Sequence, residues 1–235
     1  SKALAGFVHQ IPDTSHVTIA YSGGLDSTVL LHLFSFSPHL KGRLTARYIN
    51  HGLQDAAADW QAHCEKMCAS LGVPFKSSKI QLLSVKREGM EAVARKLRYQ
   101  ALTVDCCITT DVLVTGHHQR DQAETVVLNL ARGSGVMGLS AMPYCKELRT
   151  ESGQVMHLRP LLAIPYQKLQ DYASYFDLNW VEDPSNALTR YRRNAVRQKI
   201  LPVLNVYWPE VEKTLARTAE HMSESQTLLD RMAEM

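Results

Sequence analysis

The stretch Tyr21-Ser22-Gly23-Gly24-Leu25-Asp26-Ser27-Thr28 decides the fold that we expect for this chain. The alternating apolar residues 16–20 before it predict a β-strand, and the apolar residues 29–34 after it predict a helix. A turn between a strand and a helix gathers backbone N–H groups and a helix N-terminus at one point, which attracts anions. The adjacent glycines permit positive φ and let an anion approach the backbone closely. The stretch therefore predicts a phosphate-binding turn.

The side chains of this turn refine the prediction. Ser22, Ser27 and Thr28 add hydroxyl donors. A carboxylate such as Asp26 beside a phosphate indicates a bridging Mg²⁺. The alternative is an ordinary turn in which Asp26 caps the helix. The turn is not a Walker loop, because the pattern G-x-x-x-x-G-K-[ST] does not occur in the sequence.

Length and composition limit the class of protein. A chain of 235 residues with 45% apolar residues fits one large domain, or one domain with a small appendage. No apolar run approaches the length of a membrane span, and residues 1–15 lack the features of a signal peptide, so we expect no membrane partner. Five cysteines without metal-ligand spacing favour a reduced, cytoplasmic setting. A net charge of +3 means that any polyanion partner must be argued from local clusters.

Strands and helices are predicted to alternate along most of the chain. Strands are expected at 44–49, 73–77, 112–115 and 155–158, and helices at 56–71, 90–104, 121–130 and 165–176. Pro74 places the second of these strands at a sheet edge or makes it a strand start. This order predicts an α/β fold with a doubly wound, mainly parallel sheet. Ligands bind beyond the carboxyl ends of such strands, so the glycine turn, Asn50-His51 and Gly116-His117 are expected on one rim.

A second informative stretch is Gly116-His117-His118-Gln119-Arg120-Asp121-Gln122-Ala123-Glu124-Thr125. His117, Asp121 and Glu124 share one face if the helix extends back to His117. Two carboxylates and an imidazole suit Mg²⁺ binding, ammonium binding or proton transfer. The alternative is a helix start whose acids are favoured by the helix dipole. Zinc is not expected, because no third ligand has suitable spacing.

A glycine pattern further along is interpreted as a false match. Gly133-x-Gly135-x-x-Gly138 fits the dinucleotide-binding fingerprint, but it follows a predicted helix and not a strand. We expect a flexible loop at the active rim there.

The C-terminal part of the chain is basic and helical. Residues 189–199 carry five cations and no acid: Arg190, Arg192, Arg193, Arg197 and Lys199. With Tyr191 these cations suit RNA contact, although such a charge run is more often a solvated helix face. Residues 208–235 have too few apolar residues for an independent core. We therefore predict a catalytic domain at 1–186 and, at 187–235, a basic helical extension or a linker to further domains.

The glycine turn also resembles the pyrophosphate-binding loop of the N-type ATP pyrophosphatases, the PP-loop superfamily, which implies an adenine nucleotide α-hydrolase-like fold. The second stretch resembles, more narrowly, that of the bacterial tRNA(Ile)-lysidine synthetases. Further matching motifs occur in the family's order: Asn50-His51-Gly52-Leu53, Glu91-Ala92-x-Ala94-Arg95-x-x-Arg98-Tyr99, Arg132-Gly133-Ser134-Gly135, Arg159-Pro160-Leu161-Leu162, Glu182-Asp183-x-Ser185-Asn186 and Arg193-Asn194-x-x-Arg197. One departure is Arg120, where the family has an aspartate. Arg120 is interpreted as an exposed position or a local phosphate contact.

The resemblance implies a ligase. Such an enzyme uses ATP to adenylate the wobble cytidine of tRNA(Ile) with the anticodon CAU and releases pyrophosphate. Free L-lysine then attacks the cytidine, AMP leaves and lysidine forms. A homodimer is one option for the assembly.

The resemblance also implies roles for particular residues. It implies ATP binding by Ser22, Gly23, Gly24, Leu25, Asp26, Ser27, Thr28 and Asn50, with Mg²⁺ at Asp26. It implies catalytic roles for Asp26, Arg98, His117, Asp121 and Glu124. Contacts to lysine or tRNA are implied for Asp121, Glu124, Arg193 and Arg197.

Two other functions are kept open. One is a different PP-loop enzyme acting on tRNA, such as a thiolase, although the chain has no C-x-x-C pair for sulfur chemistry. The other is a non-catalytic module that only binds ATP, against which Asp121 and Glu124 count.

Overall fold

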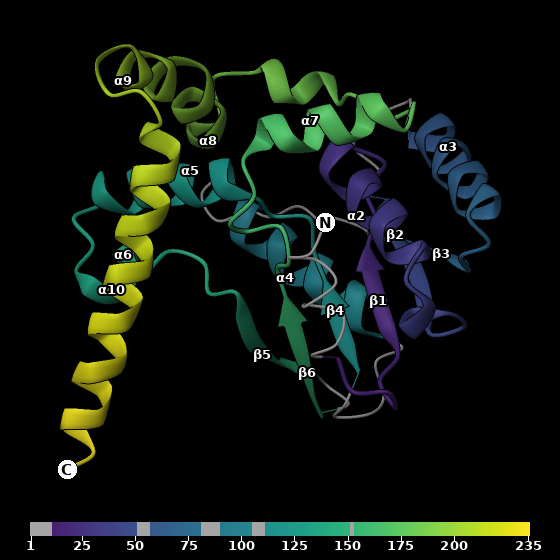
Figure 1. Cartoon of the computed structure of the whole chain (residues 1–235), viewed down its shortest axis with the longest axis horizontal. Helices are drawn as coiled ribbons and strands as arrows, with labels where there is room; N and C mark the ends of the chain where they lie inside the picture. Colours follow the sequence, from purple (N-terminus) through teal and green to yellow (C-terminus); the bar gives the residue numbers. More distant parts are fainter. Residues whose placement is uncertain (1–10, 51–56, 81–89, 105–110, 151–152) are drawn as a thin grey trace. The chain divides into compact units, whose positions relative to one another are not determined.

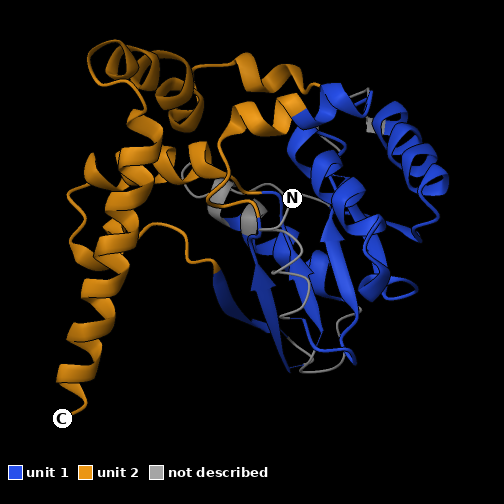
Figure 2. Ribbon diagram, viewed as in Figure 1, with its two compact units in different colours: residues 1–116, 145–160, 172–181 blue, residues 117–144, 161–171, 182–235 orange. Residues whose placement is uncertain are grey.

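The structure is a computed structural model of the chain, and it describes residues 11–50, 57–80, 90–104, 111–150 and 153–235. Within these ranges the chain forms two compact units (Figure 2). The sheet unit comprises residues 1–116, 145–160 and 172–181, and the helical unit comprises residues 117–144, 161–171 and 182–235. The units alternate along the chain, so they do not test the predicted domain boundary after residue 186, which stays a prediction.

The sheet unit is built on six strands in the order β3-β2-β1-β4-β6-β5 (Figure 1). The strands are β1 (Val17–Ala20), β2 (Leu44–Asn50), β3 (Phe75–Lys79), β4 (Val112–Val114), β5 (Cys145–Thr150) and β6 (Gly153–Leu158). Each pairing is parallel except that of β5 with β6, which is antiparallel. The predicted doubly wound, mainly parallel sheet is therefore confirmed, while β5 was not predicted.

Burial explains the positions of the strands in the sheet. The central strands β1 and β4 are buried throughout and apolar except for Thr18, as expected for parallel strands covered on both faces. The largely exposed β3 lies at the edge, as Pro74 predicts. It begins one residue after Pro74, whose carbonyl still accepts the N–H of Ala46 at 2.9 Å.

The helices were predicted largely from apolar spacing, and most lie close to the expected bounds. The helices with residues in the sheet unit are α2 (Leu25–Ser35), η1 (Pro38–Leu40), α3 (Ala57–Ser70), α4 (Met90–Thr103) and part of α7 (Tyr166–Tyr175). The helical unit holds α5 (Gln119–Leu130), α6 (Val136–Leu139), η2 (Pro184–Ala187), α8 (Arg192–Ala195), the π-helix η3 (Val196–Ile200), α9 (Leu201–Tyr207) and α10 (Val211–Ala233). No helix among the described residues has the length and apolarity needed to cross a membrane.

Each unit has its own apolar cluster. In the sheet unit, the buried residues Ala20, Ile49, Leu102, Leu113 and Val155 pack together from strands and α4. In the helical unit, Ala123 of α5 packs against Val196 and Leu201, so the basic C-terminal segment is fixed to α5 by apolar contacts. The short helix α6 corrects the expected loop in the glycine pattern, because Gly135 begins a helical turn.

Gly23 in the turn after β1 generates a stability prediction. Its φ of +80° is unfavourable for other residues, and a Cβ there would lie 2.8 Å from Cys64 Sγ. We expect Gly23→Ala to lower the free energy of unfolding by about 3 kcal/mol, from backbone strain plus steric overlap. Thermal and denaturant unfolding measure the change.

Gly42→Ala is the matched control. Gly42 has a similar φ of +76°, but a Cβ there would meet nothing within 4 Å. The Gly42→Ala variant should lose only the part of the free energy of unfolding that backbone strain accounts for, about 1 kcal/mol. Equal losses in the two variants would contradict a steric role for Cys64.

Candidate active site

The turn between β1 and α2 presents backbone donors at a helix N-terminus. Gly24 is the N-cap residue, and the N–H of Thr28 makes the first helical bond, to the Gly24 carbonyl at 2.9 Å. The preceding N–H groups of the first turn therefore have no acceptor within the helix. Such N–H groups at a helix N-terminus form a site that suits an anion such as a pyrophosphate group.

The hydroxyl groups of this turn form hydrogen bonds within the turn. Ser22 donates its N–H to Ser27 Oγ at 3.2 Å, and the two Oγ atoms are 3.1 Å apart. Ser27 Oγ also donates to the Gly24 carbonyl at 3.0 Å. Thr28 is buried, and its hydroxyl donates to the Gly23 carbonyl at 3.3 Å. Thr28 thus supports the turn from within the fold, and its predicted ATP contact stays a prediction.

Cys64 of α3 packs beneath the turn. Burial raises the pKa of the Cys64 thiol to about 12, and the neighbouring Cys68 adds to this effect. The Cys68 thiol, also buried, has its pKa raised to about 12 as well. Both thiols therefore stay protonated at neutral pH and act as packing groups, because the thiolate is the reactive form.

Gly116 brings the chain after β4 against the same turn. A Cβ at Gly116 would lie 3.0 Å from the carbonyl carbon and oxygen of Asp26 and 3.2 Å from the N of Ser27. The parallel strands β1, β2 and β4 end at this edge, so the predicted common rim is confirmed for the glycine turn and Gly116. His51 lies outside the described residues. Asn50 ends β2, and Arg98 has an exposed side chain on α4.

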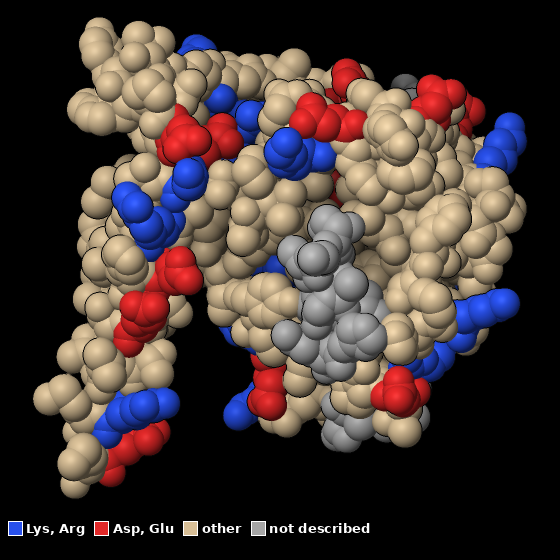
Figure 3. Space-filling view, viewed as in Figure 1, with Lys and Arg blue, Asp and Glu red and all other residues tan. Residues whose placement is uncertain are grey.

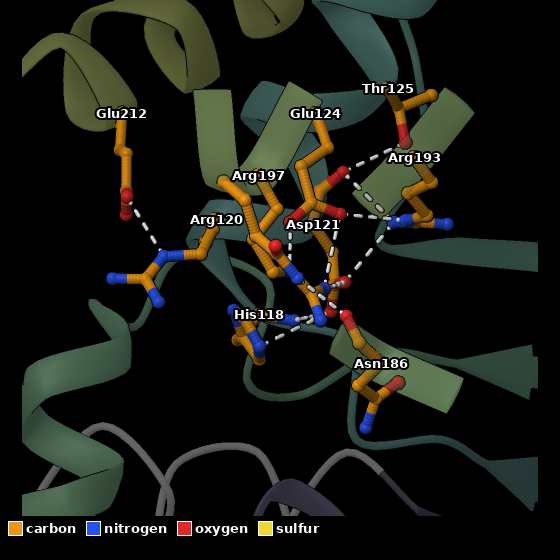
Figure 4. Close-up of polar contacts among 10 residues, drawn as sticks. His118, Arg120, Asp121, Glu124, Thr125, Asn186, Arg193, Arg197 and Glu212 are labelled. Atoms are coloured by element: carbon orange, nitrogen blue, oxygen red, sulfur yellow. Dashed lines mark hydrogen bonds and ion pairs between the residues drawn. The ribbon is translucent and has the colours of Figure 1, made fainter. Parts of the chain in front are cut away.

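The helical unit contains an ion-pair cluster with buried carboxylates on α5 and partly exposed arginines on α8 and η3 (Figure 4). The fully buried carboxylate of Glu124 accepts Arg193 Nε at 2.7 Å and Arg197 Nε at 2.5 Å. Asp121 Oδ1 accepts Arg193 Nη2 at 3.1 Å and Arg197 Nη2 at 3.4 Å. The structure thus joins all four residues predicted to contact lysine or tRNA.

The start of α5 changes the interpretation of the two histidines. The helix begins at Gln119 with His118 as its N-cap residue, so His117 lies outside it. The predicted helical face of His117, Asp121 and Glu124 is therefore not formed. His118, which sequence reasoning missed, donates its N–H to Asp121 Oδ2 at 3.0 Å. The spacing of His118 and Asp121, N-cap and N3, is the available sequence signal for this capping box.

Comparison with known proteins decides the family. The model of the PP-loop domain family matches residues 2–204. The chain belongs to the PP-loop family. Its glycine turn, residues 21–28, resembles the loop after which the family is named and is called the PP-loop.

The similar curated proteins are longer than this chain. The tRNA(Ile)-lysidine synthase of Hydrogenovibrio crunogenus is 44% identical over 99% of the chain and 55% of that protein. The tRNA(Ile)-lysidine synthase of Coxiella burnetii is 43% identical over 98% of the chain and 51% of that protein. The chain spans about half the length of the curated relatives that it matches.

Solved structures confirm the fold. The U34-tRNA thiolase NcsA of Methanococcus maripaludis, solved with its [4Fe-4S] cluster, has a TM-score of 0.72 at 19% identity, over 95% of this chain and 77% of that chain. The NH3-dependent NAD synthetase of Campylobacter jejuni has a TM-score of 0.51 at 13% identity, over 94% of this chain and 93% of that chain. The adenine nucleotide α-hydrolase-like fold predicted for this PP-loop chain is therefore confirmed.

The PP-loop side chains fit a magnesium ion held jointly with phosphate. Asp26 offers one carboxylate in the first turn of α2, and the hydroxyls of Ser22 and Ser27 lie 3.1 Å apart in the same loop. Among the described residues no group of three or more His, Cys, Asp or Glu gathers as a metal site. Mg²⁺ is commonly held by one or two carboxylates with substrate phosphates and water, so this donor set suits it.

Arg120, the departure from the family pattern, is part of an ion pair. Its Nε donates to Glu212 Oε1 of α10 at 2.8 Å. Its guanidinium lies 4.3 Å from the ring centroid of Tyr166, whose ring is 5.1 Å from that of His118. Arg120 therefore connects α5 to α10 within the helical unit, a contact that neither interpretation from the sequence included.

The charge of Asp121 is set by opposing effects. Burial by itself raises the pKa of this carboxyl group, but the positive charges of His118, Arg193 and His117, with the His118 N–H, outweigh it. The net pKa is below the ordinary value of 3.8. Asp121 is therefore ionised at neutral pH.

This lowered pKa makes the free energy of unfolding depend on pH. Because folded Asp121 binds a proton less readily than unfolded Asp121, its contribution is complete above about pH 4 and is lost as the pH falls through the folded pKa. Between pH 7 and pH 3 we expect the wild type to lose more free energy of unfolding than Asp121→Asn. Denaturant titrations at each pH measure this difference. Asp171→Asn, at an exposed position, is the control and should lose as much free energy of unfolding as the wild type. If Asp121→Asn also loses as much as the wild type between pH 7 and pH 3, the lowered pKa of Asp121 is contradicted.

Proposed function

We propose that this chain is the catalytic part of an enzyme that ligates lysine to the wobble cytidine of tRNA(Ile) with the anticodon CAU. The reaction uses ATP, passes through an adenylated cytidine and yields lysidine, AMP and pyrophosphate. The observation that carries this proposal is the sequence similarity to tRNA(Ile)-lysidine synthases, 44% and 43% over nearly the whole chain. A cytoplasmic location follows from this reaction, and a homodimer stays a prediction.

The PP-loop suits the first step, the adenylation of cytidine. The N–H groups of the first turn of α2 and the hydroxyls of Ser22 and Ser27 would bind the pyrophosphate that leaves. A magnesium ion, held by Asp26 and phosphate oxygens, would offset charge at the α-phosphate. Arg98 and His117 are proposed to stabilise phosphate charge and to orient the cytidine, and Asn50 to border the adenine.

The acid cluster suits recognition of the lysine side chain. Asp121 keeps its charge because its pKa is lowered, which favours binding of an ammonium group. The same low pKa makes Asp121 a weak proton acceptor. It therefore supports a role for Asp121 in binding the ammonium group and not in deprotonating the amine.

Glu124 suits a different role. Both of its oxygens accept hydrogen bonds from Arg193 and Arg197, and its side chain is fully buried. It is therefore proposed to position the two arginines, with Asp121 as the carboxylate nearer to the substrate.

The thiolase alternative has less support from the site. Cys64 and Cys68 are buried with raised pKa values, so their thiols are unsuited to sulfur transfer. Cys145 lies at the exposed start of β5, and Cys106 and Cys107 lie outside the described residues. The likeness to the thiolase structure shows the fold alone.

Lysine incorporation tests the proposed reaction. We expect the protein to attach labelled lysine to a tRNA(Ile) transcript with the anticodon CAU, and not to the transcript with the anticodon GAU. Asp121→Asn should keep tRNA-dependent ATP–pyrophosphate exchange and raise the KM for lysine on the order of tenfold or more, since a charge-assisted hydrogen bond is lost. Exchange that ignores this tRNA but responds to a small-molecule acid would reject the proposal. An unchanged lysine KM in Asp121→Asn would reject the ammonium site only.

Asp26→Ala tests the metal role of the PP-loop. We expect tRNA-dependent exchange to fall about a hundredfold or more at limiting Mg²⁺, with the unfolding transition preserved, because a metal ligand is removed. Asp59→Ala is a matched control, since Asp59 lies in the first turn of α3 as Asp26 does in α2. Unchanged exchange at limiting Mg²⁺ in Asp26→Ala would argue against a metal at this residue.

A further inference from the structure

The structure divides the basic C-terminal segment into two sets of cations. Residues 187–209 contain five cations and no carboxylate. Arg193 and Arg197 are directed to Asp121 and Glu124, where their charges are matched by two carboxylates. The other three cations, Arg190, Arg192 and Lys199, have exposed side chains.

We propose that Arg190, Arg192 and Lys199 form a contact surface for the RNA backbone, named here the outer basic surface. The proposal rests on the proposed function, which requires a tRNA substrate. It reverses the expectation from the sequence, which gave RNA contact mainly to Arg193 and Arg197. The charges of Arg193 and Arg197 are already matched by carboxylates, and their side chains are 32% and 31% exposed, whereas a polyanion needs cations that are exposed and uncompensated.

Charge on the outer basic surface is not matched by nearby acids. Within the described part of the chain, Arg190, Arg192 and Lys199 make no ion pair. Elsewhere the two signs are mixed: on the face drawn in Figure 3, acidic and basic side chains are interspersed. The outer basic surface is therefore a local site of uncompensated charge on a chain of net charge +3.

The geometry of the outer basic surface also suits nucleic acid. Arg192 lies in α8 and Lys199 lies seven residues later in η3, so both belong to one continuous helical run. Arg190 lies over the ring of Tyr191, 5.0 Å from its centroid, and donates to the Tyr191 hydroxyl at 3.2 Å. A guanidinium stacked on an exposed aromatic ring offers both a phosphate contact and a flat surface for an unpaired base.

The salt dependence of RNA binding tests the outer basic surface. The probe is the tRNA(Ile) transcript with the anticodon CAU, titrated by fluorescence anisotropy between 50 and 200 mM salt. We expect the triple variant Arg190→Gln/Arg192→Gln/Lys199→Gln to bind about tenfold more weakly at 50 mM salt. The slope of log Kd against log salt should fall by about 2, because each lost phosphate contact removes about 0.7 to 0.9.

A matched triple variant controls for net charge. Lys41→Gln/Lys79→Gln/Lys146→Gln removes three exposed cations of the sheet unit and should leave the slope unchanged. An unaltered slope in the outer variant, or an equal loss in the control, would overturn the proposal. The proposal would also be overturned if the outer variant no longer sedimented with phosphatidylserine vesicles but still bound RNA as the wild type does. That result would indicate a lipid-binding surface.

Lysine incorporation separates this proposal from the proposed function. If the wild type binds the transcript but attaches no lysine, the proposed function fails. The slopes of log Kd against log salt still test the outer basic surface in that case. If the wild type attaches lysine and the outer variant shows a raised KM for tRNA with an unchanged KM for lysine, both proposals are supported.

Discussion

The structure of the sheet unit depends on a close approach of backbone at the ends of two neighbouring strands. Gly23 turns the chain after β1 through a positive φ, and Gly116 leaves no room for a side chain against Asp26 and Ser27. The first turn of α2 is thereby held at the carboxyl edge of the sheet. A phosphate site of this kind needs no cationic side chain, because the donors belong to the backbone.

In the helical unit the corresponding constraint is a buried carboxylate. Glu124 is fully buried, and such a charge is tolerated only when it is paired and hydrogen-bonded. Arg193 and Arg197 provide that pairing, so α8 and η3 are fixed to α5 by charge as well as by the apolar contacts of Val196 and Leu201. Removal of one partner from such a pair typically costs about 3–5 kcal/mol, since an uncompensated charge is left behind. The cluster therefore defines where the basic segment lies within its unit.

This division of the arginines changes how a basic sequence is interpreted. A run of five cations suggests one continuous electropositive surface, yet two of the five neutralise carboxylates and three are exposed. Of this neutralised pair, Arg193 helps to lower the pKa of Asp121. The exposed cations are available to a polyanion. One short segment can thus serve two chemical purposes because a helix presents successive residues to different sides.

The sequence by itself determined the glycine turn, the parallel sheet and the rim on which that turn lies. Strand and helix periodicity are local properties, and the Gly23-Gly24 pair and the edge position after Pro74 have local backbone causes. Only the tertiary structure decided that α5 starts at Gln119, that His118 donates its N–H to Asp121, and which arginines are paired. The pairs of Arg193 and Arg197 with Glu124 join residues 69 and 73 positions apart. Such contacts follow from how helices pack, which no local pattern of residues specifies.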